Sequence, residues 1–344
     1  MSQTAEVLEF DDLAAPRLTD VQRQILEHTE SRTVDLDVDR MLADAVAQAG
    51  ADDLDDGDGI TTRIEAYVAA IEADGGLTQL IRGTLRARVV RLLRNRLSLT
   101  ALLARYPEIE SIEIERPFIV VGMPRSGTTH LVNLLAADPR RRALPYWESR
   151  DPLPLPGQGP DAFGTDPRYT AAKAEHEAMM VSAPHTAALH DRFPEAIEEE
   201  CELQDLDFSA YVLEWHARVP GWRDFYLGLD QTRHYGYTKK VLQALTFLRG
   251  PRTWVLKSPQ HSEQLTALMA TFPDATVAFT LRDPVAVVQS AITMLAYGDR
   301  NRRVNIDADE LASYWVDRIE RLLRAAVRDT HLIPEAQRVD VEFR

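Results

Sequence analysis

Apolar positions in the first third of the chain recur at the spacing of α-helices. Over residues 38–49 and 81–103, apolar side chains lie three or four positions apart, with polar and charged side chains between them. This spacing gathers the apolar side chains on one face of a helix. It predicts an all-helical N-terminal region over residues 1–112.

The pattern changes at Pro117, where short uninterrupted apolar runs replace the helical spacing. A short apolar run bounded by glycine or charged residues is typical of a strand that is buried on both faces. Helical stretches separate the successive runs, and this alternation predicts an α/β domain over residues 113–344, with a parallel sheet flanked by helices. The predicted strands are 118–121, 253–256, 276–281 and 339–343.

Residues 150–250 interrupt this alternation with a mostly helical stretch. The stretch follows a proline-rich segment, 151–157, which cannot form regular structure. We interpret the stretch as a helical insertion close to the carboxyl ends of the strands, where α/β proteins bind their ligands.

The net charge of −15 makes nucleic acid or an anionic membrane an unfavourable main partner, because a polyanion needs a broad basic face. A small anion can still bind in a local basic pocket. The sequence has neither a basic stretch followed by an apolar run at Met1 nor a segment able to span a bilayer, so a cytoplasmic protein is expected. The single cysteine, Cys201, excludes an intrachain disulfide and favours a small buried filler.

The acidic stretch 52–59 gathers oxygen ligands and suggests a calcium loop. With Gly57 at the turn position, however, Leu54 would have to be a ligand and Arg63 would replace the closing glutamate. We therefore interpret the stretch as an acidic surface loop and predict no metal site.

One segment has the form of a phosphate-binding loop. The sequence Gly-Met-Pro-Arg-Ser-Gly-Thr-Thr at 122–129 follows a predicted strand and opens a predicted helix, with Gly127 at the second glycine position of a P-loop. In this arrangement, backbone N–H groups and the positive end of the helix converge on an anion. The hydroxyls of Ser126, Thr128 and Thr129 can donate to phosphate oxygens.

The loop differs from that of nucleoside-triphosphate enzymes in where its positive charge lies. Thr128 stands where those enzymes have the lysine that reaches the β- and γ-phosphates, and Arg125 supplies a cation one turn earlier. The predicted strand 276–281 leads into Arg282, where a magnesium-binding aspartate would be expected. These residues fit a ligand with two separated phosphate groups and no metal.

From these residues, the sequence resembles the sulfotransferases that use 3′-phosphoadenosine 5′-phosphosulfate (PAPS), over about residues 117–344. Segment 124–129 is similar to the family's 5′-phosphosulfate loop, and segment 281–290 is similar to its 3′-phosphate motif. The resemblance implies a P-loop-like sulfotransferase fold, PAPS as co-substrate, and a 3′-phosphate bound by Arg282 and Ser290. Ser290 is selected by the resemblance alone.

The resemblance also implies a cation beside the group in transfer. Lys257 follows the predicted strand 253–256, at the position where the family commonly has a lysine that neutralises this group. The apolar run before Lys257 and the proline at 259 orient its side chain toward the crevice above the sheet. Together, Lys257 and Arg125 are expected to stabilise the sulfuryl and bridging oxygens.

The general base is implied by a second branch of the family. Pro259 stands where the cytosolic branch has its histidine base, whereas Golgi-type and several bacterial relatives use a glutamate downstream of the loop, which corresponds to Glu148. Trp147 beside it would exclude water from the carboxylate. The alternative for Glu148 is an ion pair with Arg142 or Arg150.

Histidines offer rival bases. His261 lies four residues after Lys257 and is the main rival, because a base there could reach the same attacking oxygen. The weaker candidates are His130, His185 and His190.

Together, these residues predict transfer of a sulfuryl group from PAPS to a hydroxyl of a small-molecule or lipid-like acceptor, without a metal. Aromatic side chains in the insertion favour a partly apolar acceptor over a free sugar. These are Trp215, Trp222, Phe225, Tyr226, Tyr235 and Tyr237.

Two other functional classes stay open, together with the acceptor's identity and the oligomeric state. One is a P-loop phosphotransferase that uses ATP and magnesium, and the other is a non-catalytic nucleotide-binding module. Relatives usually continue past the last strand with a helix and a basic segment that closes over the nucleotide. Because the sequence ends at Arg344, that lid is expected either in a longer natural tail or from another part of the protein.

Overall fold

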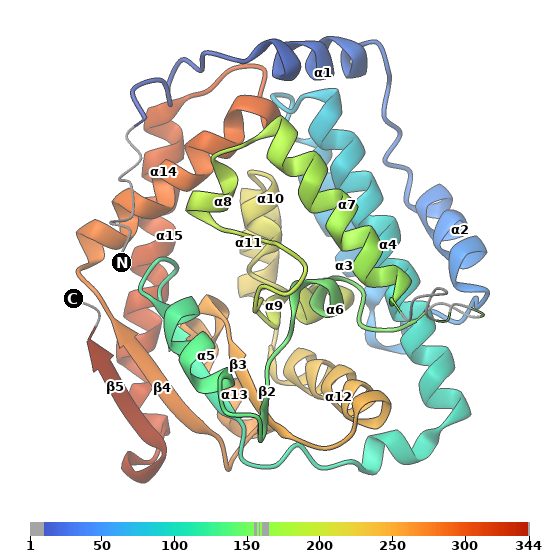
Figure 1. Cartoon of the computed structure of the whole chain (residues 1–344), viewed down its shortest axis with the longest axis vertical. Coiled ribbons are helices and arrows are strands. Elements are labelled where there is room, and N and C mark those ends of the chain that lie inside the picture. The colour runs from blue at the N-terminus through green and yellow to red at the C-terminus, as the bar shows by residue number, and fades with distance from the viewer. Residues whose placement is uncertain (1–9, 155–156, 158, 160–164, 343–344) are drawn as a thin grey trace.

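The computed structural model describes residues 10–154, 157, 159 and 165–342. Five parallel strands form one sheet in the order β2-β3-β1-β4-β5. The sheet lies at one end of the molecule and helix α1 at the other (Figure 1). The strands are parallel and helices pack against both faces of the sheet, so the predicted parallel sheet flanked by helices is confirmed. The strands are β1 (Phe118–Gly122), β2 (Arg141–Arg142), β3 (Thr253–Lys257), β4 (Thr276–Leu281) and β5 (Arg338–Glu342).

Three strands agree with the predicted runs to within one residue at each end, and β5 begins one residue before its predicted run, whose last residue, 343, lies outside the described residues. Strand β2 was not predicted. Strand β2 contains only two arginines, which pair with Thr253 and Trp254 at the edge of the sheet. Two charged residues carry no strand periodicity, so the sequence pattern could not reveal this strand.

Strand β1 explains why helices cover both faces of the sheet. Its Ile119 and Val121 pack into a core with helices α12 and α13, whereas Val120 packs with Val132 of α5 on the opposite face. Successive side chains of a strand point to opposite faces, so a wholly apolar strand needs a cover on each side. The bounds are α5 (Thr128–Ala136), α12 (Thr232–Arg249) and α13 (Leu265–Thr271).

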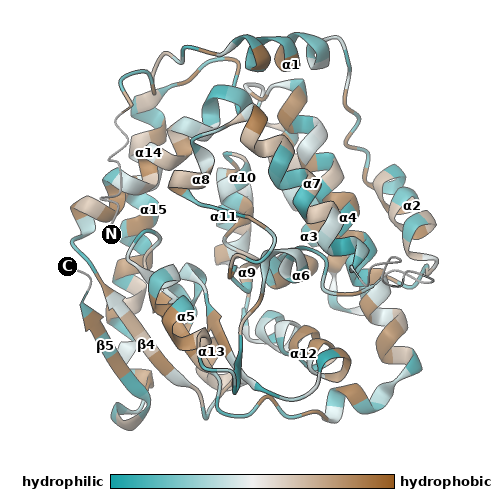
Figure 2. Ribbon diagram, in the orientation of Figure 1, coloured by the Kyte–Doolittle hydropathy of each residue, from teal (hydrophilic) through white to brown (hydrophobic). Residues whose placement is uncertain are grey.

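The N-terminal region is helical over its described residues, as predicted. Helix α2 coincides with the predicted range 38–49, and α4 contains the range 81–103. Several of these ribbons carry both apolar and polar stretches, as expected for helices with one buried face (Figure 2). The bounds are α1 (Asp20–Glu30), α2 (Val38–Ala49), α3 (Ile60–Glu72) and α4 (Gln79–Arg105).

The N-terminal helices share one hydrophobic core with part of the insertion. Tyr67 of α3 packs against Trp222 at a ring-centroid distance of 5.5 Å, and Leu213 and Tyr226 belong to the same core. The side chains of this core come from both sides of the predicted division at residues 112 and 113. That division stays a prediction.

The insertion is mostly helical, as predicted, and two long helices follow β4. Its helices are α6 (Tyr146–Arg150), α7 (Pro167–Ser182), α8 (Thr186–Leu189), α9 (Cys201–Gln204), α10 (Leu213–His216) and α11 (Pro220–Leu227). The later helices are α14 (Pro284–Arg302) and α15 (Ala308–Asp329).

Short 3₁₀ helices connect several of these elements. They are η1 (Asp56–Asp58), η2 (Pro107–Ser111), η3 (Asp205–Asp207), η4 (Pro259–Glu263), η5 (Thr330–Leu332) and η6 (Glu335–Gln337).

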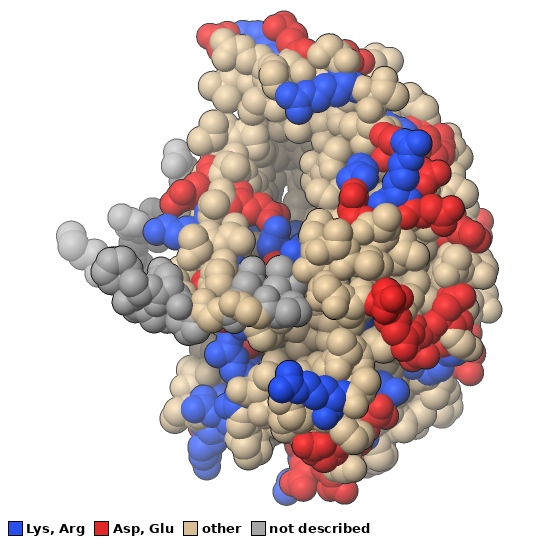
Figure 3. Space-filling view, turned by 90° about the vertical axis from the view of Figure 1, so that its right-hand side faces the viewer, with Lys and Arg blue, Asp and Glu red and all other residues tan. Residues whose placement is uncertain are grey.

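The face drawn in Figure 3 is hollowed near its centre and intersperses basic with acidic side chains. In the part of the chain that the structure describes, no helix is long and apolar enough to cross a membrane.

Candidate active site

The predicted phosphate loop connects β1 to α5. Arg125 and Gly127 adopt positive φ angles of 68° and 88°, which turn the chain from the strand into the helix. At Gly122, a Cβ atom would lie 2.1 Å from Oγ1 of Thr280 and 2.8 Å from Oγ of Ser126, so only glycine allows the loop to approach β4 this closely. The N-terminus of α5 at Thr128 therefore faces the end of the sheet, as an anion site requires.

The hydroxyl groups of the loop face two directions. Thr128 and Thr129 line a cavity above the sheet. In contrast, Oγ of Ser126 is buried, donates to the carbonyl oxygen of Met123 at 2.6 Å, and lies 2.7 Å from Oγ1 of Thr280. The Ser126 side chain therefore links the loop to β4. Because its hydroxyl is already engaged, the backbone of Ser126 is the part that remains for anion binding.

Three residues predicted from two separate segments, 124–129 and 281–290, come together beside the loop. Nε of Arg125 donates to Oγ of Ser290 at 3.1 Å, and a guanidinium nitrogen of Arg282 donates to the carbonyl oxygen of Arg125 at 2.5 Å. Burial and the positive charge of Arg282 lower the pKa of Arg125, although Glu199 acts in the opposite direction. An anion bound here would therefore gain from two neighbouring cations.

Lys257 ends β3 and lies directly behind the cavity wall. Its Nζ donates to Oγ1 of Thr129 at 3.0 Å and to Oε1 of Glu199 at 2.9 Å. Burial alone would lower the pKa of Lys257, but the carboxylates of Glu199 and Glu198 outweigh burial and raise it. Lys257 is therefore a permanent cation that touches both the loop and an acidic side chain of the cavity.

Glu148 lies apart from this group of residues. Its Oε2 accepts from Arg142 at 2.7 Å and its Oε1 from Arg249 at 2.9 Å, and the side chain is 3% exposed. It is not among the residues that line the cavity. The role of Glu148 as general base stays a prediction, and its contacts are those of the ion pair weighed as the alternative, with Arg249 as a second partner.

The main histidine rival is also engaged elsewhere. His261 is buried, with Nε2 hydrogen-bonded to Oε1 of Glu200 and Nδ1 lying 2.7 Å from the hydroxyl of Tyr235. With both ring nitrogens bonded, this imidazole has no atom left for an acceptor hydroxyl. Among the weaker candidates, His130 and His190 line the cavity and His185 does not.

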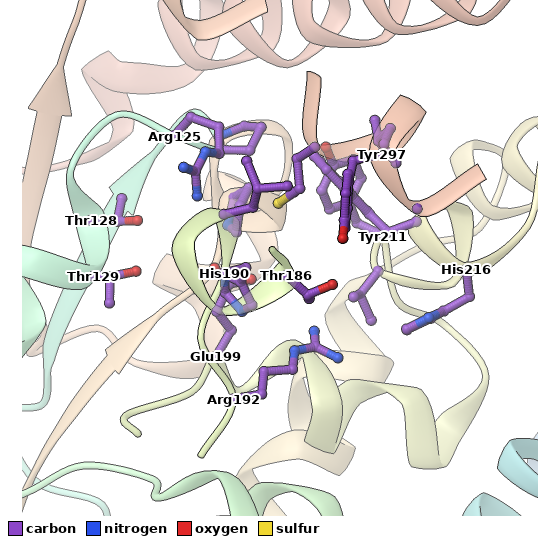
Figure 4. A pocket seen from close by; sticks show the side chains of 18 of the residues that line it. Arg125, Thr128, Thr129, Thr186, His190, Arg192, Glu199, Tyr211, His216 and Tyr297 are labelled. Atoms are coloured by element: carbon purple, nitrogen blue, oxygen red, sulfur yellow. The ribbon is translucent and has the colours of Figure 1, made fainter. Parts of the chain in front are cut away.

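The cavity has a volume of about 420 Å³ and extends from the phosphate loop to helices of the insertion and α14. In Figure 4, Thr128 and Thr129 lie on one side of the pocket and His216 on the other, with Glu199 and Arg192 between them. Apolar side chains form much of its wall, as is usual for small-molecule sites. Examples are Met179, Leu189, Val212, Trp215 and Leu295.

The predicted aromatic residues divide between pocket and core. Trp215 lines the cavity, together with Tyr211 and Tyr297, which were not singled out from the sequence. Trp222 and Tyr226 are fully buried in the core that includes the N-terminal helices. Helical spacing alone cannot separate these two environments, because both bury one face of a helix.

Sequence reasoning missed the acidic residues around the cavity. Glu199 contacts Lys257, Glu200 accepts from the backbone N–H of Lys257 at 2.6 Å, and Glu198 accepts from Arg192 at 3.2 Å. The run 198–200 is visible in the sequence as an acidic stretch, and with Glu202 it places four acidic residues beside Cys201, a signal that could have led to the site. Cys201 itself is buried, and burial raises the pKa of its thiol well above its ordinary value.

The acidic stretch 52–59 makes ordinary protein contacts. Oδ2 of Asp58 lies 3.1 Å from a guanidinium nitrogen of Arg63 and 3.0 Å from one of Arg96. Within residues 10–154, 157, 159 and 165–342, no cluster of three or more histidine, cysteine or acidic side chains could hold a metal ion.

Comparison with known proteins shows the family to which the chain belongs. The model described as "Sulfotransferase family" matches residues 117–344. Over 188 residues, the chain is 27% identical to the omega-hydroxy-beta-dihydromenaquinone-9 sulfotransferase Stf3 of Mycobacterium tuberculosis and of Mycobacterium bovis, and the match covers 53% of this chain and 46% of each relative. The chain thus spans about half the length of these curated relatives.

Solved structures show the same architecture. Sulfotransferase STF1 from Mycobacterium tuberculosis superposes with a TM-score of 0.78 at 28% identity, over 91% of this chain and 85% of the other. Sulfotransferase STF9 from Mycobacterium avium superposes with a TM-score of 0.79 at 23% identity, over 90% of this chain and 80% of the other. The N-terminal helices are therefore included in the shared fold, since each superposition extends well beyond the residues that match the family model.

Proposed function

The chain belongs to the sulfotransferase family, and we propose that it transfers a sulfuryl group from PAPS to a hydroxyl group of a partly apolar small molecule. The observation that carries this proposal is the arrangement of cations around the phosphate loop. Arg282 contacts the loop at Arg125, and Lys257 contacts it at Thr129, next to a cavity that is large enough for an acceptor.

In this proposal, two groups of residues bind the donor PAPS. The backbone of loop 122–129 and the hydroxyls of Thr128 and Thr129 bind the phosphosulfate end, where the N-terminus of α5 adds a favourable dipole. Arg282 and Ser290 bind the 3′-phosphate. This division is supported by the contact between Ser290 and Arg125, which brings the start of α14 beside the loop.

In the proposed transfer step, the acceptor oxygen forms a bond to sulfur while the bond between sulfur and the bridging oxygen breaks. The electron pair of that bond leaves with 3′-phosphoadenosine 5′-phosphate. Lys257 and Arg125 stabilise the negative charge that grows on the sulfuryl and bridging oxygens. Lys257 is buried and Arg125 is half-buried, and the attraction between charges is stronger away from water.

The acceptor proton goes to the carboxylate of Glu199 in this scheme. Glu199 lines the cavity, and its Oε1 lies 2.9 Å from Nζ of Lys257, which itself contacts the loop. A base must be within hydrogen-bond reach of the hydroxyl while that hydroxyl faces sulfur. The position of Glu199 supports this role better than that of Glu148, whose two oxygens are held by Arg142 and Arg249.

A partly apolar acceptor is supported by the cavity wall and by a relative. Rings and aliphatic side chains, including those of Trp215, Val212 and Leu189, line the cavity. The curated relative Stf3 is named for an omega-hydroxy menaquinone, in which a hydroxyl is attached to a lipid-like molecule. We propose an acceptor of that general chemistry, with a free sugar as the disfavoured alternative.

Calorimetry with the full chain distinguishes this proposal from an ATP-dependent phosphotransferase. We expect 3′-phosphoadenosine 5′-phosphate to bind about 100-fold more tightly than ATP, because ATP lacks the 3′-phosphate that Arg282 would bind. A chelator should leave that affinity unchanged, since arginine and lysine supply the positive charge that magnesium supplies in phosphotransferases. Tighter binding of ATP that requires magnesium would favour the phosphotransferase instead.

A further inference from the structure

Arg302 is a half-buried cation whose charge is poorly matched by its surroundings. It is the last residue of α14 and lines the cavity, and its guanidinium donates one hydrogen bond, of 2.9 Å, to the carbonyl oxygen of Trp215. Among the described residues, no carboxylate oxygen lies within 4.0 Å of it. A guanidinium has five N–H donors, so most of this one's capacity is unused.

The nearest acidic group on the same helix does not compensate this charge. Burial lowers the pKa of Arg302, and the attraction of Asp299 does not restore it, because Arg192 acts in the same direction as burial. Burial in turn raises the pKa of Asp299. Arg192 differs from Arg302, since it has carboxylate oxygens of Glu198 and Glu202 at 3.2 and 3.6 Å.

His216 lies in the same part of the cavity and also has an unused polar atom. Its Nε2 is buried without a hydrogen-bond partner, and its side chain extends into the pocket in Figure 4. Burial and the positive charges of arginines, Arg192 and Arg302 among them, hold the pKa of His216 well below its ordinary value. The imidazole is therefore neutral at physiological pH and lies in a positive potential.

A glycine allows Arg302 to lie close to its own helix. At Gly298, a Cβ atom would lie 3.1 Å from Cζ of Arg302 and 3.3 Å from both of its terminal nitrogens. Gly298 also lines the cavity, so the guanidinium lies against bare backbone at the cavity wall. An alanine at 298 would shift the guanidinium by a few tenths of an ångström through contact alone.

We infer that Arg302 and His216 form a subsite for an anionic group of the acceptor, such as a carboxylate or a phosphate. The acceptor is then an amphiphile with its hydroxyl toward the phosphate loop, an apolar body along Trp215 and Leu295, and its anionic group at Arg302. A half-buried cation at a cavity wall, with donors that no protein group uses, gains from a ligand that brings both the opposite charge and hydrogen-bond acceptors. This inference rests on the proposed function and specifies its substrate class.

The inference is tested with acceptors matched in length. Transfer from PAPS is measured with 1-decanol, with 10-hydroxydecanoate and with the corresponding 10-hydroxydecyl phosphate, and the readout is the ratio of kcat/KM between each anion and decanol. We expect the wild-type chain to favour at least one anion by about 10- to 100-fold, the range of a charge-assisted contact in a partly buried site. The two anionic compounds show which of the two groups the subsite prefers.

Substitutions then test whether the preference for an anionic acceptor depends on Arg302. In Arg302→Met the ratio should fall to near one, and because it is a ratio, a general loss of activity cancels. Arg303→Met is the matched control, since Arg303 is already paired with Asp74 at 2.8 Å and lies outside the cavity wall, and it should keep the wild-type ratio. If Arg302→Met fails to bind 3′-phosphoadenosine 5′-phosphate, Gly298→Ala displaces the same guanidinium without deleting a charge and should also lower the ratio.

The outcomes separate the two levels of the proposal. A wild-type ratio near one or below, with transfer to decanol intact, would overturn the anionic subsite and leave the proposed function standing. A ratio that persists in both Arg302→Met and Gly298→Ala would overturn it as well. No transfer to any of the three acceptors, or to a phenol, would count against the proposed function itself.

Discussion

Replacing Glu199 with glutamine is expected to lower kcat by about 10²- to 10⁴-fold, the usual range for the loss of a general base. Glutamine keeps the size of the side chain and can still accept a hydrogen bond from Lys257, but it cannot take a proton. The affinity for 3′-phosphoadenosine 5′-phosphate should stay close to that of the wild type. Turnover with an aliphatic alcohol measures the effect, because its proton cannot leave unaided.

Two controls give this result its meaning. With a phenol that is already ionised at the assay pH, Glu199→Gln should lose far less activity, a difference that mere damage to the fold would not produce. Glu148→Gln is the matched variant: losing a buried partner of Arg142 and Arg249 should lower Tm while turnover stays nearly normal. Near-normal turnover in Glu199→Gln, together with loss of turnover in Glu148→Gln, would return the base to Glu148.

Replacing Arg282 with alanine is expected to weaken the binding of 3′-phosphoadenosine 5′-phosphate by about 2–4 kcal/mol, because the 3′-phosphate loses a charge-assisted contact. Calorimetry on the folded variant measures this directly. The substitution also removes the 2.5 Å hydrogen bond to the carbonyl oxygen of Arg125, so part of the loss could come from movement of the loop.

A nucleotide without the 3′-phosphate separates these two causes. Adenosine 5′-phosphosulfate should lose little affinity in Arg282→Ala if the arginine binds the 3′-phosphate. Arg338→Ala, which deletes an arginine paired with Asp340 on β5, should leave both affinities unchanged. An equal loss for both nucleotides in Arg282→Ala would show that Arg282 holds the loop and does not bind the 3′-phosphate.

Local patterns predicted most of the fold. The range 38–49 was predicted as a helix and is α2, and the apolar run 276–281 was predicted as a strand and is β4. Both signals come from neighbouring residues, so they do not depend on the tertiary structure. Strand β2 was missed because its two arginines are extended only through pairing with β3.

The site was predictable where a motif or a strand end marks it, and not elsewhere. Thr129 and Arg282 are placed by the local order of strand, loop and helix, and both line the cavity. Glu199 lies just before α9, and Arg302 is the last residue of α14. Both line the cavity only because segments that are distant in the sequence pack together. For Glu148, the decisive contact is with Arg249, which lies 101 positions away in the sequence.

Transfer of sulfur from ³⁵S-labelled PAPS is the most direct test of the proposed function. The full chain is incubated with labelled PAPS and a panel of hydroxyl acceptors, and both the labelled product and 3′-phosphoadenosine 5′-phosphate are measured. We expect label to enter at least one apolar acceptor in equal amount to the nucleotide formed, and Lys257→Met to abolish most of that transfer. A chain that binds 3′-phosphoadenosine 5′-phosphate but transfers no label to any acceptor of the panel would contradict the account and indicate a nucleotide-binding module without catalysis.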